Sequence, residues 1–330
     1  MIDASDSHVE ESLDQANAQF DRSRTPWVIA FVLGIALLLS CVIGGPLVMF
    51  LLYSRDNARR TQCEFNLKDL ALNMDAYYGV HGSFPSGWDV AADEDPPQPS
   101  WGWPAKVLTV TDSIYPTADA LDETLGGVLV QNDQRLELIE AVMSQYLCPA
   151  DDIYAFEGEN HPDRRWVHND KPVAFGLSTY VGNVGNLHDV AGAKPNTGIF
   201  FGNSHITIDQ VTDGQSFTIM VGERDLTKCR AGSWPGVPNP MSHDGGPSIW
   251  SVVAGAKPNI NAPPWDSDTE CGEGFSSFHP GGVNVLMVDG SVKFLSDNID
   301  SHWTADPHSA EMGVLQRMMI RDDGQPVPGE

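Results

Sequence analysis

The chain has few basic residues. Lys and Arg number 19 against 45 Asp and Glu among 330 residues, so the formal net charge at pH 7 is -26. A surface this acidic repels phosphate backbones, which excludes general nucleic-acid binding. The sequence also lacks a dinucleotide-binding G-x-G-x-x-G, a phosphate-binding loop, a C-x-x-C pair and a G-x-S-x-G nucleophile motif. We therefore expect no cofactor, no metal and no nucleic-acid partner, and we predict that the protein is not an enzyme.

Charge is missing from one long segment. No charged residue lies between Arg24 and Arg55, and residues 27–53 are almost wholly apolar, with Trp27 and Tyr53 at the ends. This run exceeds the roughly 20 residues that a helix needs to cross a bilayer, and aromatic residues favour the headgroup layer. A removable signal peptide is the alternative, but its apolar region is usually only about 7–15 residues long. We predict a transmembrane helix over residues 25–54, with the lipid bilayer as partner.

The segment before this run, residues 1–24, is an acidic tail with few large apolar residues, and we expect it to be disordered. Topology has two opposing signals. Three Arg residues follow the apolar run and two precede it, which slightly favours a cytoplasmic C-terminal domain. The cysteines favour the other side, because four of them follow the run, and spaced cysteines suit two disulfides in an oxidising compartment. Four buried thiols are the alternative for Cys63, Cys148, Cys229 and Cys271.

Beyond the apolar run the helical pattern continues. Apolar residues from Cys63 to Tyr78 recur at intervals of three and four, which places one apolar stripe on a helix that Gly79 and Gly82 end. One helix cannot bury its stripe alone, so later strands must cover it. A Gly-Gly-Pro sequence at residues 44–46 predicts a kink in the apolar half.

The rest of the chain indicates short strands between turns. Residues 133–147 predict a short helix. Asp289-Gly290 lies between two alternating runs and predicts a hairpin, and Asp213-Gly214 repeats that pattern. The fold class is therefore α+β, a long N-terminal helix packed on an antiparallel sheet, with many loops. The expected strands are Thr197–Gly202, Ile206–Val211, Phe217–Val221, Ser248–Val253, Val283–Val288 and Val292–Ser296.

Six segments in order resemble those of one family. FHPGGVNVLMVDG places His279 ten residues before Asp289, which is similar to the His-x9-Asp-Gly signature of the DUF1559 family, pilin- and pseudopilin-like surface proteins abundant in planctomycetes. The post-anchor helix ending in Gly-Ser-Phe-Pro also resembles that family, as do Leu-Cys-Pro-Ala-Asp at 147–151, Ser-Thr-Tyr-Val-Gly-Asn at 178–183, Thr-Asp-Gly-Gln-Ser-Phe-Thr at 212–218 and Gly-Glu at 222–223. The motif residues carried over are Cys148, Pro149, Asp213, Gly214, Glu223, His279, Asp289 and Gly290.

The resemblance implies a pilin-like α+β domain at residues 55–310, followed by a C-terminal tail at 311–330. It also implies a single-pass protein of the cytoplasmic (inner) membrane, with this domain in the periplasm or at the cell surface. We expect a structural or interaction role, with partners among envelope proteins or a type II secretion-like machinery. One feature departs from pilins: residues 22–27 read RSRTPW, without the Gly before the run or the Glu at its fifth position that prepilin processing uses. We therefore expect a permanently anchored relative rather than a pilus subunit.

The cysteines allow three pairings, of which we favour Cys63–Cys148 and Cys229–Cys271. Cys63 lies on the apolar face of the helix and Cys148 follows the second expected helix, while the other two lie in glycine-rich loops.

Two other functions stay open. Loop tryptophans, which could stack on sugars, suggest a surface carbohydrate- or ligand-binding module, and the His279 and Asp289 pair suggests a hydrolase, although both residues also suit structural roles. The tryptophans are Trp88, Trp101, Trp103, Trp166, Trp234 and Trp265. Glu223 is expected either to pair with Arg224 or Arg230 or to end a strand in solvent. The acidic stretch 151–170 is a weak calcium candidate, because its spacing does not match an EF-hand loop.

Overall fold

A computed structural model describes most of the chain. The described residues are 26–38, 40, 44–90, 100–111, 121, 138–151, 165–168, 171–187, 195–226, 229, 232–237, 248–263 and 271–325. The acidic tail, the position of a prepilin cleavage site and most of the calcium candidate therefore lie outside the described residues. The chain divides into two compact units, Met1–Asn57 and Ala58–Glu330.

The first unit contains the apolar run. Residues 26–38 are helical, and helix α2 begins at Gly45. The large apolar side chains of this unit are exposed, with Trp27 at 80% and Met49 at 72%. Among the described residues, no helix combines the length and the apolar character needed to span a bilayer. Residues 25, 39 and 41–43, which fall within the predicted span 25–54, lie outside the described part.

The remaining elements are short apart from α2. The helices are α2 (Gly45–His81), α3 (Trp103–Leu108) and α6 (Val314–Met318), and the 3-10 helices are η3 (Ser144–Tyr146), η5 (Ile208–Gln210), η6 (Ser248–Ser251) and η7 (Cys271–Glu273). The strands are β1 (Ser100–Trp101), β2 (Arg165–His168), β3 (Lys171–Ala174), β4 (Leu177–Ser178), β5 (Tyr180–Gly185), β6 (Ile219–Glu223), β7 (Gly232–Ser233), β8 (Gly236–Val237), β9 (Val253–Gly255), β10 (Gly282–Met287) and β11 (Val292–Ser296).

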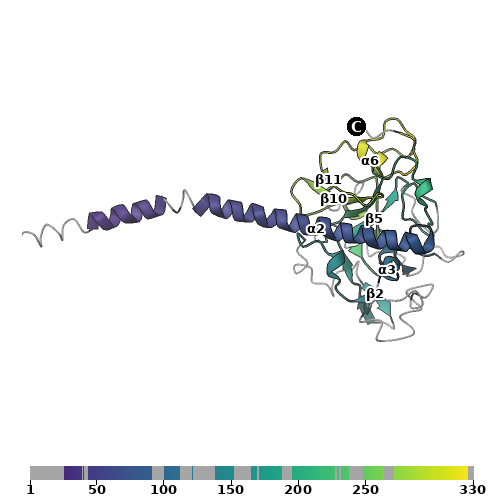
Figure 1. The fold of residues 1–330 in the computed structure, drawn as a ribbon, viewed down its shortest axis with the longest axis horizontal. Helices are drawn as coiled ribbons and strands as arrows, with labels where there is room; N and C mark the ends of the chain where they lie inside the picture. Colours follow the sequence, from purple (N-terminus) through teal and green to yellow (C-terminus); the bar gives the residue numbers. More distant parts are fainter. Residues whose placement is uncertain are drawn as a thin grey trace, which may run out of the picture. The chain divides into compact units, whose positions relative to one another are not determined.

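A five-stranded sheet in the order β11-β10-β6-β5-β9 forms the centre of the second unit (Figure 1). The pairs β11–β10, β10–β6 and β6–β5 are antiparallel, whereas β5 and β9 are parallel. The sheet is therefore mixed, which confirms the α+β class and corrects the expectation of a purely antiparallel sheet. Three two-stranded sheets, β1–β8, β2–β3 and β4–β7, accompany it.

The two faces of this sheet bury separate cores. On one face the stripe of α2 packs against Leu286 and Val288, with Cys63, Leu67, Leu70 and Met74 nearly inaccessible. On the other face Val283, Val285 and Met287 pack against α6. Alternation along β10 produces this division, because successive side chains of a strand point to opposite faces. The predicted stripe of α2 is thus buried as expected, and the helix ends at His81 before Gly82 (φ 73°).

Strands β10 and β11 form the predicted hairpin. Leu286 pairs with Val292 and Gly282 with Ser296, and Gly290 has φ 82°. The turn differs from the expected one, in which both Asp289 and Gly290 have positive φ: only Gly290 does, and its N–H bonds to the Met287 carbonyl. This is a turn closed by a left-handed glycine, as in three-residue hairpin loops.

Two expected strands are absent. Residues 197–202 turn back on β5, because the N–H groups of Gly198 and Ile199 bond to the carbonyls of Val184 and Asn183. Residues 206–211 contain η5, which a capping box between Thr207 and Gln210 begins. Ser248–Val253 is mostly η6, with strand β9 starting at its last residue. Phe217–Val221 is displaced by two residues into β6.

The expected helix at 133–147 is confirmed at residues 138–139, which are helical, and is wrong beyond them. Residues 141–143 are not helical, and η3 follows them. Two carbonyls that a helix would use bond elsewhere: Ile139 O accepts from Gly176 N–H, and Ala141 O accepts from Trp234 Nε1. Residues 311–325, expected as a tail, contain α6, and Leu315, Met319 and Ile320 are buried in the second unit.

Candidate functional site

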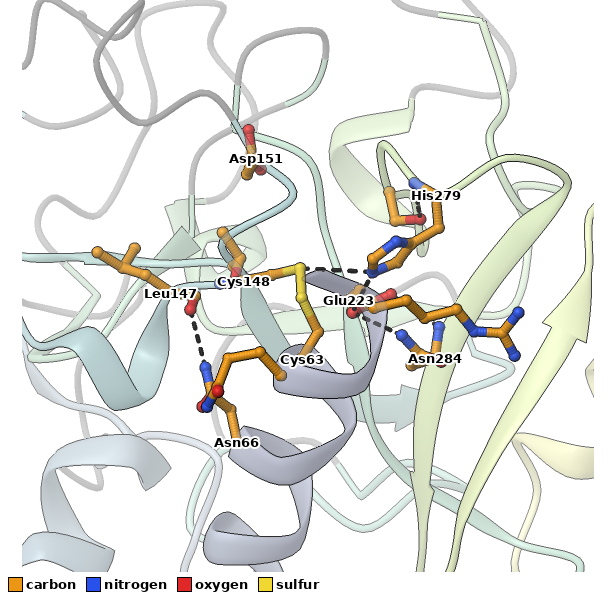
Figure 2. Close-up of a disulfide and its surroundings, with 12 residues drawn as sticks. Cys63, Asn66, Leu147, Cys148, Asp151, Glu223, His279 and Asn284 are labelled. Carbon is orange, nitrogen blue, oxygen red and sulfur yellow. Dashed lines mark hydrogen bonds and ion pairs between the residues drawn. A yellow bond between two sulfur atoms is a disulfide. The ribbon is translucent and has the colours of Figure 1, made fainter. Parts of the chain in front are cut away.

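A disulfide joins α2 to the rest of the second unit. Cys63 and Cys148 are bonded, with their Cα atoms 4.9 Å apart (Figure 2). A second disulfide joins Cys229 to Cys271, with Cα atoms 5.3 Å apart. Both are the pairs favoured from the sequence, and both Cα separations fall in the range normal for disulfides.

Side-chain hydrogen bonds fix the position of Cys148. Its N–H bonds to Thr179 Oγ1 at 2.7 Å. The carbonyl of the preceding residue, Leu147, accepts a hydrogen bond of 2.9 Å from Asn66 Nδ2, one turn beyond Cys63 on α2 (Figure 2). Thr179 belongs to the Ser-Thr-Tyr segment, so two of the family-like segments and α2 meet at this cystine.

Glu223 ends strand β6 on the side that faces α2. Its Oε2 accepts the Asn284 N–H at 2.7 Å, and its Oε1 accepts Asn284 Nδ2 at 3.0 Å. Asn284 lies on β10, on the same face as Leu286. Asn284 on β10 thus binds both oxygens of this buried carboxylate and fixes its position on the neighbouring strand β6. The fixed oxygens can accept from a further donor or bind a cation.

His279 lies between the carboxylate and the disulfide. Its Nε2 is 3.2 Å from Glu223 Oε1 and 3.4 Å from Cys148 Sγ. A disulfide sulfur and an ionised carboxylate only accept, so Nε2 carries the hydrogen in this arrangement. The loop is held by Ser277, whose Oγ accepts the His279 N–H and donates to the Gly282 carbonyl.

These groups are removed from solvent. The exposed fractions are 0% for Cys63, 4% for Cys148, 1% for Glu223 and 4% for His279. Burial, together with the nearby charge of Glu223, raises the pKa of Tyr180 well above its usual value. With this raised pKa, Tyr180 stays a neutral phenol beside the cluster. Its OH donates to the Cys63 carbonyl at 3.4 Å.

Of the two partners predicted for Glu223, Arg224 is wrong. Arg224 points to the other side of β6, where its guanidinium donates to the carbonyls of Gly274, Trp250 and Val253. Neighbouring strand residues face opposite ways, so Arg224 cannot reach Glu223. Arg230 lies outside the described residues.

His279 and Asp289 do not form a pair. They flank opposite ends of β10, whose six residues span about 17 Å. Asp289 Oδ1 instead accepts the N–H and hydroxyl of Ser291, at 2.9 and 2.6 Å. Partial burial acts to raise the pKa of Asp289, but hydrogen bonds from Ser291 and Ser216 and the charge of Lys293 outweigh it and lower that pKa. Asp289 and Gly290 therefore shape the hairpin.

Asp213 has a similar structural position. Its carboxylate accepts the N–H groups of Asp323 and Gly324, at 2.5 and 2.8 Å, and so fastens the C-terminal segment rather than closing a hairpin. Burial and then the charge of Asp213 raise the pKa of Asp323 to about 6, against the opposing hydrogen bond from Gln325. Gly214 has φ 100°, which explains glycine at that position.

Four of the tryptophans proposed to bind sugars are buried. Trp88, Trp103 and Trp234 have no exposed surface and Trp101 has 1%. They contribute to the core on the α2 side of the sheet and cannot stack on an external ring. The Trp166 side chain and Trp265 lie outside the described residues.

A cleft of about 880 Å³ adjoins the cystine. Its walls come from α2 and from the segment that carries Cys148 and Pro149. The described residues that line it are Arg59, Gln62, Asn66, Asp69, Val142, Ser144, Gln145, Leu147, Cys148, Pro149, Ala150 and Asp151.

The comparison with family models matches residues 54–302 to the family described as "Protein of unknown function (DUF1559)". The chain belongs to the DUF1559 family. Neither the curated proteins nor the solved structures yielded a match. The matched range contains Cys63, Cys148, Glu223 and His279, so the cluster lies wholly within the DUF1559 region.

Sequence reasoning identified three of the motif residues at the cluster but did not bring them together. It missed Asn66, Thr179 and Asn284, which hold the others in place. The signal available was the order of the motifs: Leu-Cys-Pro, Ser-Thr-Tyr, Gly-Glu and the histidine each contribute one residue to the same site.

Proposed function

We propose that this DUF1559 protein is a single-pass membrane protein whose extracytoplasmic head has a structural or interaction role, in the manner of a pseudopilin, and that it is not an enzyme. The observation that carries the proposal is the buried joint between α2 and the sheet. One helix, Gly45–His81, contains part of the apolar run at its start and Cys63 at its midpoint.

The motif residues support a structural role because their hydrogen bonds are internal. Thr179 holds Cys148, Asn66 holds Leu147, and Asn284 holds Glu223. Such contacts fix the helix against the sheet and keep Cys148, Glu223 and His279 away from solvent. A head that transmits force or position from its anchor needs a rigid joint of this kind.

Two features support the location. Apolar side chains from Trp27 to Tyr53 are exposed in the described residues, and burying that surface in lipid is favourable. Disulfides form and persist mainly in oxidising compartments, so the two disulfides favour the periplasm or cell surface for the head. Partners among envelope or secretion proteins follow from this location and from the pilin-like resemblance.

Protease treatment of intact spheroplasts, combined with non-reducing electrophoresis, tests the proposal. We expect the protease to cleave the head from the outside of intact spheroplasts. Without protease, we expect the chain to stay with membranes after carbonate extraction. The released head should migrate faster when oxidised than when reduced. A head protected in intact spheroplasts, or a full-length chain in the soluble fraction without detergent, contradicts it.

The cleft beside Cys148 favours a second function, binding of a small polar ligand. Its described lining contains Arg59, Asp69 and several amides but no aromatic side chain, which fits polar recognition better than stacking on sugars. A screen of polar metabolites for thermal stabilisation tests it, with Arg59→Ala as the variant expected to lose the effect. An unchanged melting temperature with every compound would exclude the ligand-binding function.

A further inference from the structure

Four side chains of the metal-binding types meet at the cystine. The ligand atoms of Cys63, Cys148, Glu223 and His279 all lie within 4.8 Å of one another, and all four residues are buried. They come from α2, the loop after η3, strand β6 and the loop before β10 (Figure 2). This convergence does not depend on the role proposed above.

The distances suit a tetrahedral ion. Zinc lies about 2.0–2.3 Å from nitrogen, oxygen and thiolate ligands, so its ligands lie about 3.3–3.8 Å from one another. His279 Nε2 is already 3.4 Å from Cys148 Sγ and 3.2 Å from Glu223 Oε1. The main movement required is separation of the two sulfurs after their bond is broken.

The surroundings already orient the ligands as second-shell groups do at metal sites. Asn284 donates to both oxygens of Glu223, and the Cys148 N–H is held by Thr179. Outer hydrogen bonds of this kind fix ligand geometry and strengthen metal binding. Cys148 also lines the cleft of about 880 Å³, which offers a path for a small reductant and an ion.

We propose that the reduced form of this cluster binds one zinc ion through Cys63, Cys148, Glu223 and His279. Either the disulfide or the zinc ion then connects α2 to the rest of the cluster. A dithiol supplies two electrons and two protons: the S–S bond breaks, both cysteines become thiols, and the dithiol becomes a disulfide. Zinc binding then displaces the two thiol protons to solvent. His279 binds through the Nε2 lone pair, with its ring hydrogen on Nδ1, and Glu223 Oε1 exchanges its contact with His279 for the metal.

The other disulfide provides an internal control. Cys229 Sγ accepts a hydrogen bond from Ser276 Oγ at 3.2 Å. Within the described residues, no group of three or more metal-type ligands includes Cys229 or Cys271. Among the described residues, reduction of that pair therefore does not complete a group of metal-type ligands.

The test uses the full-length chain in detergent, reduced without oxygen by a phosphine, freed of reductant and titrated with Co²⁺. We expect one Co²⁺ per chain, with thiolate-to-cobalt charge transfer and the visible bands of tetrahedral cobalt, and loss of these bands on adding Zn²⁺. The oxidised chain is expected to show neither. The C229S/C271S variant should keep the signal, C63S/C148S should lose it, and H279A should weaken binding at least about tenfold.

Circular dichroism accompanies each titration. A reduced chain that stays folded but binds no cobalt overturns the proposal, as does equal binding by C63S/C148S and the unaltered chain. If reduction unfolds the chain, refolding by Zn²⁺ supports the proposal, because metal binding then supplies folding free energy. Failure of Zn²⁺ to refold it contradicts the proposal.

Discussion

Replacing Glu223 with glutamine tests whether the buried carboxylate holds the joint. The change keeps size and shape but turns one acceptor oxygen into a donor amide. Both oxygens accept in the structure: Oε2 from the Asn284 N–H, and Oε1 from Asn284 Nδ2 and His279. Either orientation of the glutamine amide therefore sets a donor against a donor.

The expected loss of stability follows from the number of buried donors that the substitution leaves without an acceptor. With the amide oxygen toward His279, the Asn284 N–H and the new amide N–H face each other at a site where the atoms lie 2.7 Å apart. Each buried donor left without an acceptor costs about 1–3 kcal/mol, and relief from burying the charge offsets part of this. We expect E223Q to lower the free energy of unfolding by about 2–4 kcal/mol.

Urea unfolding of the oxidised chain in detergent, followed by the fluorescence of the buried tryptophans, measures this change. Glu311 is exposed, so E311Q makes the same chemical substitution without the buried contacts and is expected to change stability by less than about 0.5 kcal/mol. If E223Q and E311Q unfold at the same urea concentration, the carboxylate does not stabilise the joint.

Three further predictions follow from single contacts. C63S/C148S opens a loop of 85 residues and should cost about 4.6 kcal/mol in the chain-entropy model, measured by urea unfolding; a loss under about 1 kcal/mol contradicts it. The folded pKa of Asp323 is raised from 3.8 to about 6, so the folded chain binds more protons between these values and stability falls as pH rises through them; D323N should flatten this slope in melting curves, and an unchanged slope refutes the assignment. G290A should cost about 1 kcal/mol from its φ of 82° alone, since an added Cβ approaches Ala71 Cβ only to 3.7 Å; an unchanged melting temperature contradicts this strain.

Local patterns predicted the elements whose stability is local. The stripe of α2 and the Asp289-Gly290 hairpin were both predictable, because three-to-four periodicity and a turn dipeptide act within a few residues. The capping box at Thr207 and Gln210 was visible too, but its neighbouring apolar residues were interpreted as a strand. Strand β5 was missed because Gly182, Asn183 and Gly185 resemble a turn. Gly182 is required instead by packing, since an added Cβ would lie 2.5 Å from the Phe200 ring.

The cluster could not be predicted from spacing. Its four ligand-type residues are separated by 85, 75 and 56 positions along the chain, so no short motif contains two of them. Metal motifs are recognised from ligands on one helix or one loop, and here each residue comes from a different element. Only the sheet register, which aligns Val285 with Gly222, brings Asn284 beside Glu223.

The same register gives a physical meaning to the His-x9-Asp-Gly signature. The nine intervening residues are Pro280 and Gly281, the six residues of β10, and Val288. The histidine must precede β10 to reach Glu223, and the Asp-Gly turn must follow β10, so the length of the strand sets the nine-residue spacing.

One alanine inserted after Asn284 would send Leu286 to the opposite face and break the core against α2, because side chains alternate along a strand. We expect this insertion to abolish the cooperative urea transition, whereas an alanine inserted after the exposed Asn298 should keep it. Equal tolerance of the two insertions would show that the spacing has another cause.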